Sequence, residues 1–177
     1  MATTTAEEIE GRFPPNIRMP EELRHFCSWV MENGYPISGC FKLRSDYYEA
    51  VKYWFGKDDF VHRFGMFGAG ADGSLHNLWV QDDGKVVVVH MGSEGDSNFV
   101  LAENFKDFLR LLAIGYSELG FDDLSKPPAP EGINPKFQQW VRDTYKVTIP
   151  TLGSEIIVPA KERCQDFTAW IEQAVSA

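Results

Sequence analysis

The chain has 177 residues, and its 17 basic and 26 acidic side chains give a formal net charge of -9. The hydrophobic fraction of 44% and the charged fraction of 24% exclude bulk disorder, and the length predicts one compact domain, with or without an appendage. Residues 1–90 carry -4 and residues 91–177 carry -5, so the charge belongs to a folded surface that disfavours nonspecific nucleic-acid binding and favours basic partners.

The first third of the chain predicts a flexible start followed by one helix. Residues 1–18 are a polar lead-in that ends at Pro14-Pro15. Residues 20–33 predict an amphipathic helix, because Pro20 suits a first turn and Asn33-Gly34 is a good stop. Its apolar positions follow the i, i+3, i+4, i+7 spacing of a buried helical stripe: Leu23, Phe26, Cys27 and Val30. Residues 37–43 indicate a short strand, and residues 46–55 are ambiguous between helix and strand.

The middle of the chain predicts strands. Residues 60–67, 75–80 and 85–91 are rich in Val, Leu and aromatic residues. Asp83-Gly84 lies between the last two, and an Asp-Gly pair between two apolar runs favours a hairpin because glycine tolerates the positive φ that the turn needs.

The last part of the chain predicts helices again. Asn104 caps a helix that Gly115 ends, and residues 122–135 form an extended connection with four prolines. Asn134-Pro135 then begins a short helix, Ile156–Val158 indicates a strand, and a final helix has four apolar residues at helical spacing: Phe167, Trp170, Ile171 and Ala174. Of the five tryptophans, Trp140 and Trp170 are expected in the core and Trp29 at its edge.

Strands in the middle with helices on both sides favour an α+β fold with a central, mostly antiparallel sheet. We therefore divide the chain into a flexible N-terminal segment (1–18), an α+β core (19–121), and a Pro-rich connection with a C-terminal helical extension packed on the core (122–177).

Three glycines, Gly68, Gly70 and Gly73, spell G-x-G-x-x-G. A dinucleotide site needs this turn to run from a strand into a helix. Here SLHNLWV follows, which is strand-like, so the motif predicts a tight loop and no nucleotide cofactor.

Five residues are candidate metal ligands by side-chain type: His62, His76, His90, Asp72 and Asp96. Neighbouring hairpin strands could bring His76 and His90 together, but no H-x-x-x-H or paired-cysteine spacing occurs. We expect each histidine to lie on a sheet face, hydrogen-bonded or solvated, and we expect no metal.

The chain offers no clear catalytic set. Cys27 lies on the apolar stripe and does not face His25 on a helix, and reduced buried thiols are the default for the three cysteines, Cys27, Cys40 and Cys164. Glu94, Asp96 and Glu103 could supply an acid–base pair, but loop carboxylates beside glycines are usually turn formers or solvated groups. An enzyme or small-ligand protein that uses the loops 65–74 and 92–97 remains a third hypothesis.

Trp54-Phe55 followed by Asp58-Asp59 is typical of a protein-binding hot spot, in which an aromatic anchor is flanked by acids. The alternative for Trp54 is partial burial against the sheet.

The order of segments resembles the SUKH superfamily, which contains bacterial toxin-immunity proteins and fungal cell-wall assembly regulators. The resemblance covers roughly residues 20–120 and rests on four segments: PEELRHFCSWVMENG, FGMFGAGADGSLHNLWV, VVVVHMGSEG and LAENFKDFLRLLAIG. Residues 121–177 do not match.

The resemblance implies an α+β domain without catalysis that binds and neutralises a cognate toxin, often a nuclease or a deaminase. The shared positions would be Gly34, Asp72, Gly73, Trp79, Gly92, Glu94, Gly95, Ala102 and Phe108. Most of them suit turns and packing, whereas Asp72 and Glu94 suit a loop network or a cleft.

The leading hypothesis is therefore a cytoplasmic, non-catalytic immunity-type protein that binds a basic toxin domain and neither nucleic acid nor membrane. The alternative is a regulatory or scaffold module that binds a cellular protein. The N-terminus has no basic start and no apolar core, so no secretory signal is expected. The candidate binding residues are Trp54, Asp58, Asp59, Asp72, Glu94 and Asp96.

Overall fold

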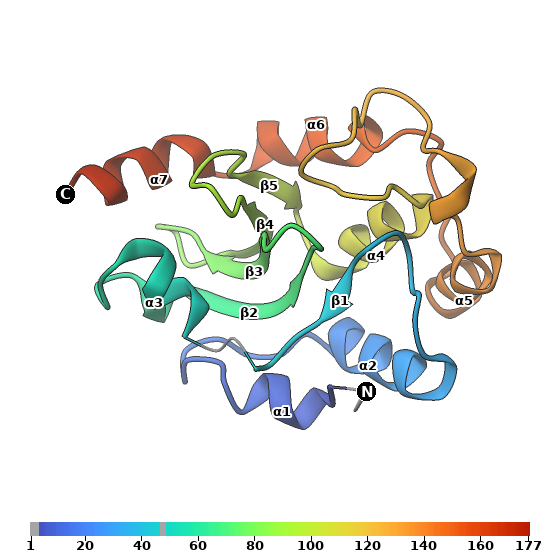
Figure 1. Cartoon of the computed structure of the whole chain (residues 1–177), viewed down its shortest axis with the longest axis horizontal. Helices are drawn as coiled ribbons and strands as arrows, with labels where there is room; N and C mark the ends of the chain where they lie inside the picture. The colour runs from blue at the N-terminus through green and yellow to red at the C-terminus, as the bar shows by residue number, and fades with distance from the viewer. Residues whose placement is uncertain (1–3, 47–48) are drawn as a thin grey trace.

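The structure is a computed structural model that describes residues 4–46 and 49–177. Across these residues it forms a five-stranded sheet with seven α-helices (Figure 1). The strands are β1 (Lys42–Leu43), β2 (Phe64–Ala69), β3 (Leu75–Val80), β4 (Val86–Met91) and β5 (Phe99–Ala102). The helices are α1 (Ala6–Glu10), α2 (Glu21–Asn33), α3 (Ala50–Phe55), α4 (Phe105–Ile114), α5 (Pro135–Tyr145), α6 (Ser154–Arg163) and α7 (Phe167–Ser176), with 3-10 turns at Val61–Arg63 and Pro130–Gly132. The predicted α+β class is confirmed.

The sheet is a meander in which the strands lie in chain order and every pair is antiparallel. Leu78 pairs with Val88 and Trp79 with Val87, so successive residues of β3 and β4 face opposite sides. Nearly every residue of the central strands is buried. Both faces of the sheet are therefore covered by other elements.

Two hydrophobic clusters form these layers. On one face, Phe67 and Leu78 pack with α2, α4 and α5; on the other face, Phe64 and Trp79 pack with α3 and α7. Each large side chain that is fully buried contributes roughly 1.5–3 kcal/mol by its removal from water. α6 lies against the edge strand β5, which leaves that edge covered.

The helix predictions for α2, α4, α5 and α7 are confirmed, and α4, α5 and α7 are capped by side chains at their first turns. Asn104, Asn134 and Asp166 each accept a hydrogen bond from a backbone N–H in the first turn, which satisfies donors that the helix itself leaves unpaired. Gly115 ends α4 with a φ of 108°.

Several predictions differ from the structure. The polar lead-in contains α1, whose Ile9 is buried, and Ile17 is buried as well, so residues 4–18 pack on the core. Ile156–Val158 belongs to α6, so the strand prediction was wrong. The ambiguous stretch 46–55 forms α3 from Ala50 onward, and residues 47–48 lie outside the described part of the chain.

The strands also differ in extent from the predictions. The strand expected at 37–43 is only two residues long, the strand expected at 60–67 begins at Phe64, and β5 was not predicted. Among the tryptophans, Trp29 is buried at 6% exposure, whereas Trp140 and Trp170 are half-buried against the two clusters.

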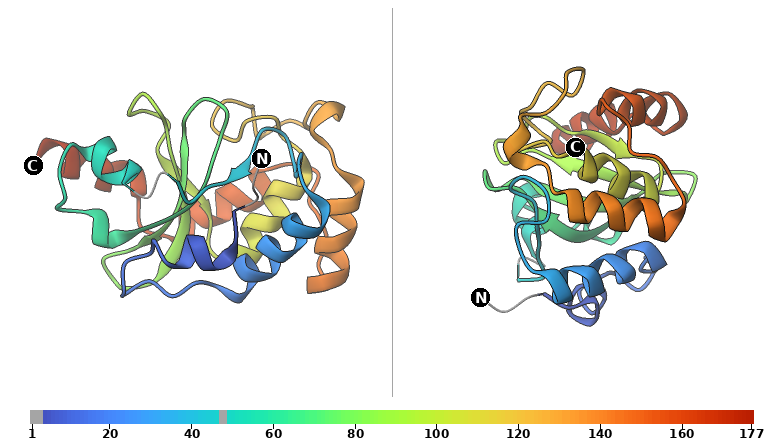
Figure 2. Two further views of the ribbon diagram at one scale, coloured as in Figure 1. Left: turned by 60° about the horizontal axis from the view of Figure 1, so that its bottom comes forward. Right: turned by 90° about the vertical axis from the view of Figure 1, so that its right-hand side faces the viewer.

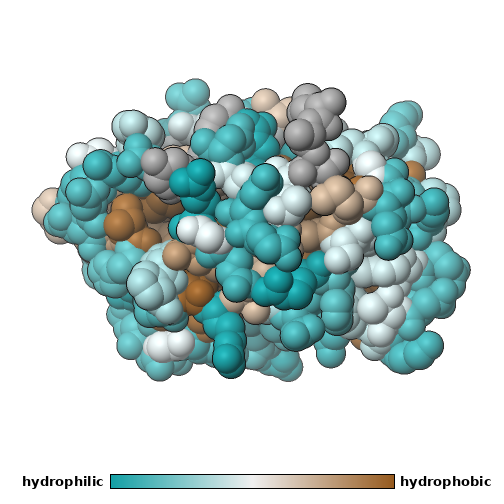
Figure 3. All heavy atoms as spheres, turned by 90° about the horizontal axis from the view of Figure 1, so that it is seen from below, coloured by the Kyte–Doolittle hydropathy of each residue, from teal (hydrophilic) through white to brown (hydrophobic). Residues whose placement is uncertain are grey.

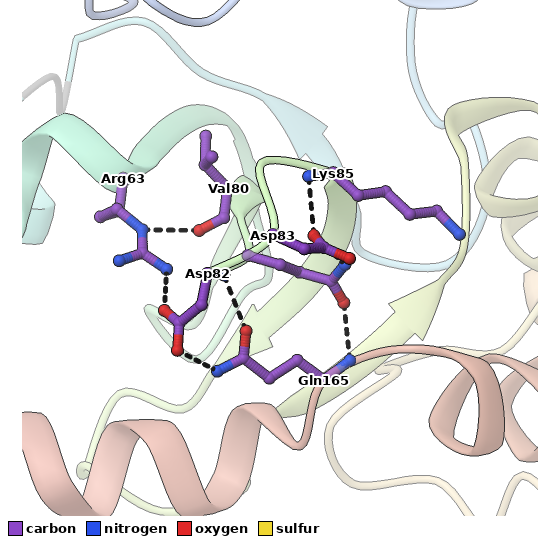
Figure 4. Close-up of polar contacts among 7 residues, drawn as sticks. Arg63, Val80, Asp82, Asp83, Lys85 and Gln165 are labelled. Atoms are coloured by element: carbon purple, nitrogen blue, oxygen red, sulfur yellow. Dashed lines mark hydrogen bonds and ion pairs between the residues drawn. The ribbon is translucent and has the colours of Figure 1, made fainter.

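The turn between β3 and β4 is fixed by side chains that arrive from elsewhere in the chain (Figure 4). Arg63 Nε donates to the carbonyl of Val80 at 2.6 Å, and Arg63 Nη2 meets Asp82 Oδ1 at 2.7 Å. Gln165, between α6 and α7, accepts from the Asp82 N–H and donates to its carboxylate, each at 2.8 Å. The acidic side chain of Asp82 thus serves to hold this turn in place.

Within residues 4–46 and 49–177, no helix has both the length and the apolar character needed to cross a bilayer.

Candidate protein-binding surface

The opposite end of the sheet carries two loops that lie side by side, the β2–β3 turn (70–74) and the β4–β5 loop (92–98). They rise together at the top of the left view in Figure 2. Gly73 of the first lies close to Ser93 of the second, since a Cβ at Gly73 would stand 3.6 Å from the Ser93 Cβ. The G-x-G-x-x-G motif begins at Gly68 in β2 and runs into the first of these turns, where one strand leads into another and no helix follows.

Each loop is held by its own hydrogen bonds. Asp72 Oδ1 accepts from the N–H of Ser74 at 3.1 Å and from its hydroxyl at 2.7 Å, which is the local bonding that lets Asp form turns. In the second loop, the Asn98 side chain accepts from the Gly92 N–H and donates to the Gly95 carbonyl. A Cβ on Gly92 would stand 1.9 Å from the carbonyl oxygen of Asp96, so only glycine fits there.

A third segment, residues 117–122, is tied to the first turn. Glu118 Oε1 accepts from the backbone N–H of Ala71 at 2.8 Å, and Asp122 Oδ2 accepts from the N–H of Ser117 at the same distance. Phe121 projects from this segment with 73% of its surface exposed. These contacts hold an exposed aromatic ring beside the acidic loops.

α3 supplies two further aromatic side chains. The indole N–H of Trp54 donates to the carbonyl of Gly92 at 2.8 Å, and its ring is half-buried. Tyr53 is 74% exposed. We call the three segments 70–74, 92–98 and 117–122, together with Tyr53 and Trp54, the loop face.

The structure brings together four of the six candidate binding residues: Trp54, Asp72, Glu94 and Asp96. Glu94 and Asp96 are exposed, and neither forms a hydrogen bond or an ion pair with any residue of the described chain. Asp72 is half-buried. Burial raises its pKa, but the hydrogen bonds from the side chain and backbone of Ser74 outweigh this effect, so its pKa lies below the ordinary value.

The other two candidates, Asp58 and Asp59, follow the end of α3 and do not join the loop face. Asp58 Oδ1 lies 3.3 Å from Lys52 Nζ, and it borders a different cavity of about 360 Å³ floored by Phe64 and Met66. Seen from below, the surface is mostly hydrophilic, with hydrophobic atoms in a hollow on the side where α3 lies (Figure 3). Asp58 therefore borders a separate cavity from the loop face to which Trp54 belongs.

Two histidines lie beneath the loops on facing positions of β3 and β4. His76 pairs with His90 in the strand register, and their ring centroids are 5.3 Å apart. His76 is 3% exposed, and neither of its ring nitrogens has a hydrogen-bond partner among the described residues. Burial lowers its pKa well below 6.5, so the ring is neutral at pH 7.

His90 is the second of the pair and the one in contact with the loops. Its Nδ1 lies 2.7 Å from the carbonyl oxygen of Ser97. Burial lowers its pKa, while the Ser97 carbonyl and the charges of Asp72 and Asp96 act in the opposite direction. His62 lies apart, in the turn before β2. In the part of the chain that the structure describes, no three His, Cys, Asp or Glu side chains gather as a metal-ion site.

The candidate catalytic residues do not lie together. Cys27 is buried, and burial raises the pKa of its thiol to about 12, so it is not a thiolate at pH 7. Glu103 lies 2.7 Å from Lys85 Nζ and 3.4 Å from Arg163 Nη1, where it serves as an ion-pair partner and does not join Glu94 and Asp96.

Sequence reasoning missed Tyr53, Phe121 and Glu118. Tyr53 escaped because residues 46–55 were ambiguous; once they form a helix, Val51, Trp54 and Phe55 take the i, i+3, i+4 face and Tyr53 falls outside it. Phe121 is a single aromatic residue within a polar, acidic stretch, and that contrast is the signal that could have identified it.

Comparisons with protein-family models, with curated proteins and with solved structures find no match to this chain.

Proposed function

We propose that the chain is a non-catalytic protein-binding domain that docks a basic protein partner on the loop face. The observation that carries this proposal is the combination of exposed carboxylates without internal partners, Glu94 and Asp96, with the exposed rings of Tyr53 and Phe121. The sequence resemblance to the SUKH superfamily supports the further proposal that this partner is a cognate toxin, for example a nuclease or a deaminase, and that the chain is its immunity protein.

Charge supports a basic partner. Carboxylates that have no cation nearby keep their full field toward solvent, and such fields raise the association rate with an oppositely charged protein. Enzymes that act on nucleic acids need basic surfaces to hold phosphates, so an acidic loop face would complement them.

The aromatic side chains support an affinity role. Exposed tyrosines and other large rings on a surface are the residues that most often dominate binding energy. Here the loops beneath them are already fixed by Asn98, Asp72 and Glu118. A surface that is ordered before binding loses less conformational entropy when the partner arrives.

The test is co-expression with the product of the adjacent toxin gene, scored by cell survival and by complex formation in size exclusion. We expect the wild type to protect and to co-elute. The double variant Glu94→Lys/Asp96→Lys should lose protection. A matched control, Glu32→Lys/Glu162→Lys, changes the net charge by the same amount at exposed positions of α2 and α6, and it should keep protection.

Undiminished toxicity with no complex for the wild type would refute the immunity proposal for that pair. Equal loss in the two double variants would show that net charge alone, and not the loop face, controls binding.

A further inference from the structure

A recess lies between α3 and the two turns of the loop face. Its volume is about 560 Å³. α3 contributes Tyr53 and Trp54, the turns contribute Gly73 and Ser93, and Leu75 forms an apolar floor. Two carboxylates, Asp46 and Glu49, stand at its border. The recess thus combines aromatic walls with acidic groups and includes no basic side chain among its described lining.

The aromatic wall is fixed in place. Trp54 is anchored by its indole N–H on the Gly92 carbonyl, and Phe55 packs against its ring edge-on at a centroid distance of 5.0 Å. Because the hydrogen bond joins α3 to the β4–β5 loop, the ring keeps one orientation relative to Ser93. An occupant would therefore meet an aromatic surface that is already oriented.

The carboxylates of the recess are not equivalent. Asp46 is bound by Arg44, with N···O distances of 2.8 and 2.9 Å, and this contact lowers its pKa. Glu49 accepts a hydrogen bond from the hydroxyl of Tyr53 at 3.3 Å, and it forms no ion pair with a residue of the described chain. Lys52 is attracted electrostatically by Glu49, but it pairs with Asp58 at 3.3 Å, so the carboxylate of Glu49 stands beside the aromatic wall without an ion-pair partner of its own.

We propose that this recess receives an arginine side chain, whose guanidinium lies against Trp54 or Tyr53 and pairs with Glu49. A guanidinium is planar, stacks on aromatic faces and matches a carboxylate with two parallel N–H donors. An anionic group would be repelled by Glu49, and an apolar group would desolvate its charge without compensation. That the arginine belongs to a protein partner rests on the proposed function.

The probe is N-acetyl-L-arginine amide, and its control is N-acetyl-L-citrulline amide, which has nearly the same shape without the charge. Binding is followed by the ¹H–¹⁵N resonance of the Trp54 indole, assigned by its absence in Trp54→Phe. We expect a saturable shift of that resonance with the arginine probe and none with citrulline. Glu49→Gln should weaken the binding about threefold or more, because it removes the charge from the pair.

Two further variants keep the test independent of folding. Tyr53→Ala removes a ring that is mostly exposed, so it should preserve the fold and weaken binding. Glu162→Gln, in α6, should leave binding unchanged. No saturable shift at roughly 100 mM probe, which is above the weak affinity expected of a single residue, would overturn the proposal, as would an equal response to citrulline.

The failures of the two proposals are distinguishable. If the arginine probe does not bind while Glu94→Lys/Asp96→Lys still abolishes the complex with the toxin, the recess proposal is wrong and the proposed function stands. If the probe binds and no basic partner is found, the recess binds guanidinium groups and the proposed function is wrong.

Discussion

The two ends of the sheet carry acidic turns of similar composition that serve different purposes. At the β3–β4 end, Asp82 is held by Arg63 and Gln165, and Asp83 accepts from the N–H of Lys85 (Figure 4). At the loop face, Glu94 and Asp96 have no such partners in the described chain. Net charge alone therefore does not identify a binding surface; the charges that matter are those that the fold leaves uncompensated.

The largest effect should come from the glycine that closes the loop face. Gly92→Ala would place a Cβ 1.9 Å from the Asp96 carbonyl oxygen, so we expect a loss of about 3 kcal/mol or more in the free energy of unfolding. Urea denaturation measures it.

Gly95→Val, in the same loop, provides a loss in the free energy of unfolding with which that of Gly92→Ala can be compared. Gly95 has a φ of 83° and open space around its Cβ position, so we expect only the strain of the backbone, about 1 kcal/mol or more. Equal losses for the two variants would show that Gly92 does not close the loop as described.

The second prediction concerns how the free energy of unfolding depends on pH. His76 has a pKa well below 6.5 when folded and an ordinary pKa when unfolded, so the unfolded state binds more protons below pH 6.5. The contribution of His76 to stability is therefore present above this pH, and it should be lost progressively as the pH falls below 6.5, at up to about 1.4 kcal/mol per pH unit.

His76→Leu should remove most of this loss, because both ring nitrogens lack partners and a leucine suits the surrounding phenylalanine rings. Unfolding curves at pH 8 and pH 5 for the two proteins measure it. His90 retains its own contribution in both. An unchanged dependence on pH in His76→Leu would contradict the assignment.

The third prediction concerns the β3–β4 end of the sheet, where Asp82 is held by Arg63 and Gln165. Gln165→Ala removes two hydrogen bonds to Asp82, and we expect a loss of about 1–2 kcal/mol in the free energy of unfolding. Binding of the partner should not change, since Gln165 lies at the other end of the sheet. A variant with normal stability and impaired binding would reverse our assignment of the two ends.

The smallest effect should come from Asp58→Lys/Asp59→Lys. The Asp58–Lys52 pair is exposed, and pairs of this kind contribute little, so stability should change by less than about 0.5 kcal/mol. Because these acids lie outside the loop face, partner association should also be preserved. Slower association in this variant would place the interface at the cavity that Asp58 borders instead.

The sequence predicted the elements whose signals are local. The Asn caps of α4 and α5, the helical spacing of apolar residues in α7 and the Asp83-Gly84 turn between two apolar runs are visible in a few neighbouring residues, and the structure confirms these elements. Ile156–Val158 resembles a strand because all three residues are β-branched, yet these residues lie in α6, which continues through Pro159. There, packing against β5 overrides local preference.

The candidate site was only partly predictable for the same reason. Trp54, Asp72, Glu94 and Asp96 were identified as candidates, but nothing local separates them from Asp82. The partners of Asp82 stand 19 and 83 residues away along the chain, and contacts at such separations are set by the fold. The sequence therefore located acidic turns without indicating which of them remain available for binding.

The most direct test of whether the loop face is the binding surface is the rate of association with the toxin protein encoded by the adjacent gene, measured at two salt concentrations. Our account predicts that Glu94→Lys/Asp96→Lys slows association and makes it less sensitive to salt, whereas Glu32→Lys/Glu162→Lys retains nearly the wild-type rate and salt dependence. Equal slowing in both variants, or none in the first, would contradict the claim that the loop face is the binding surface.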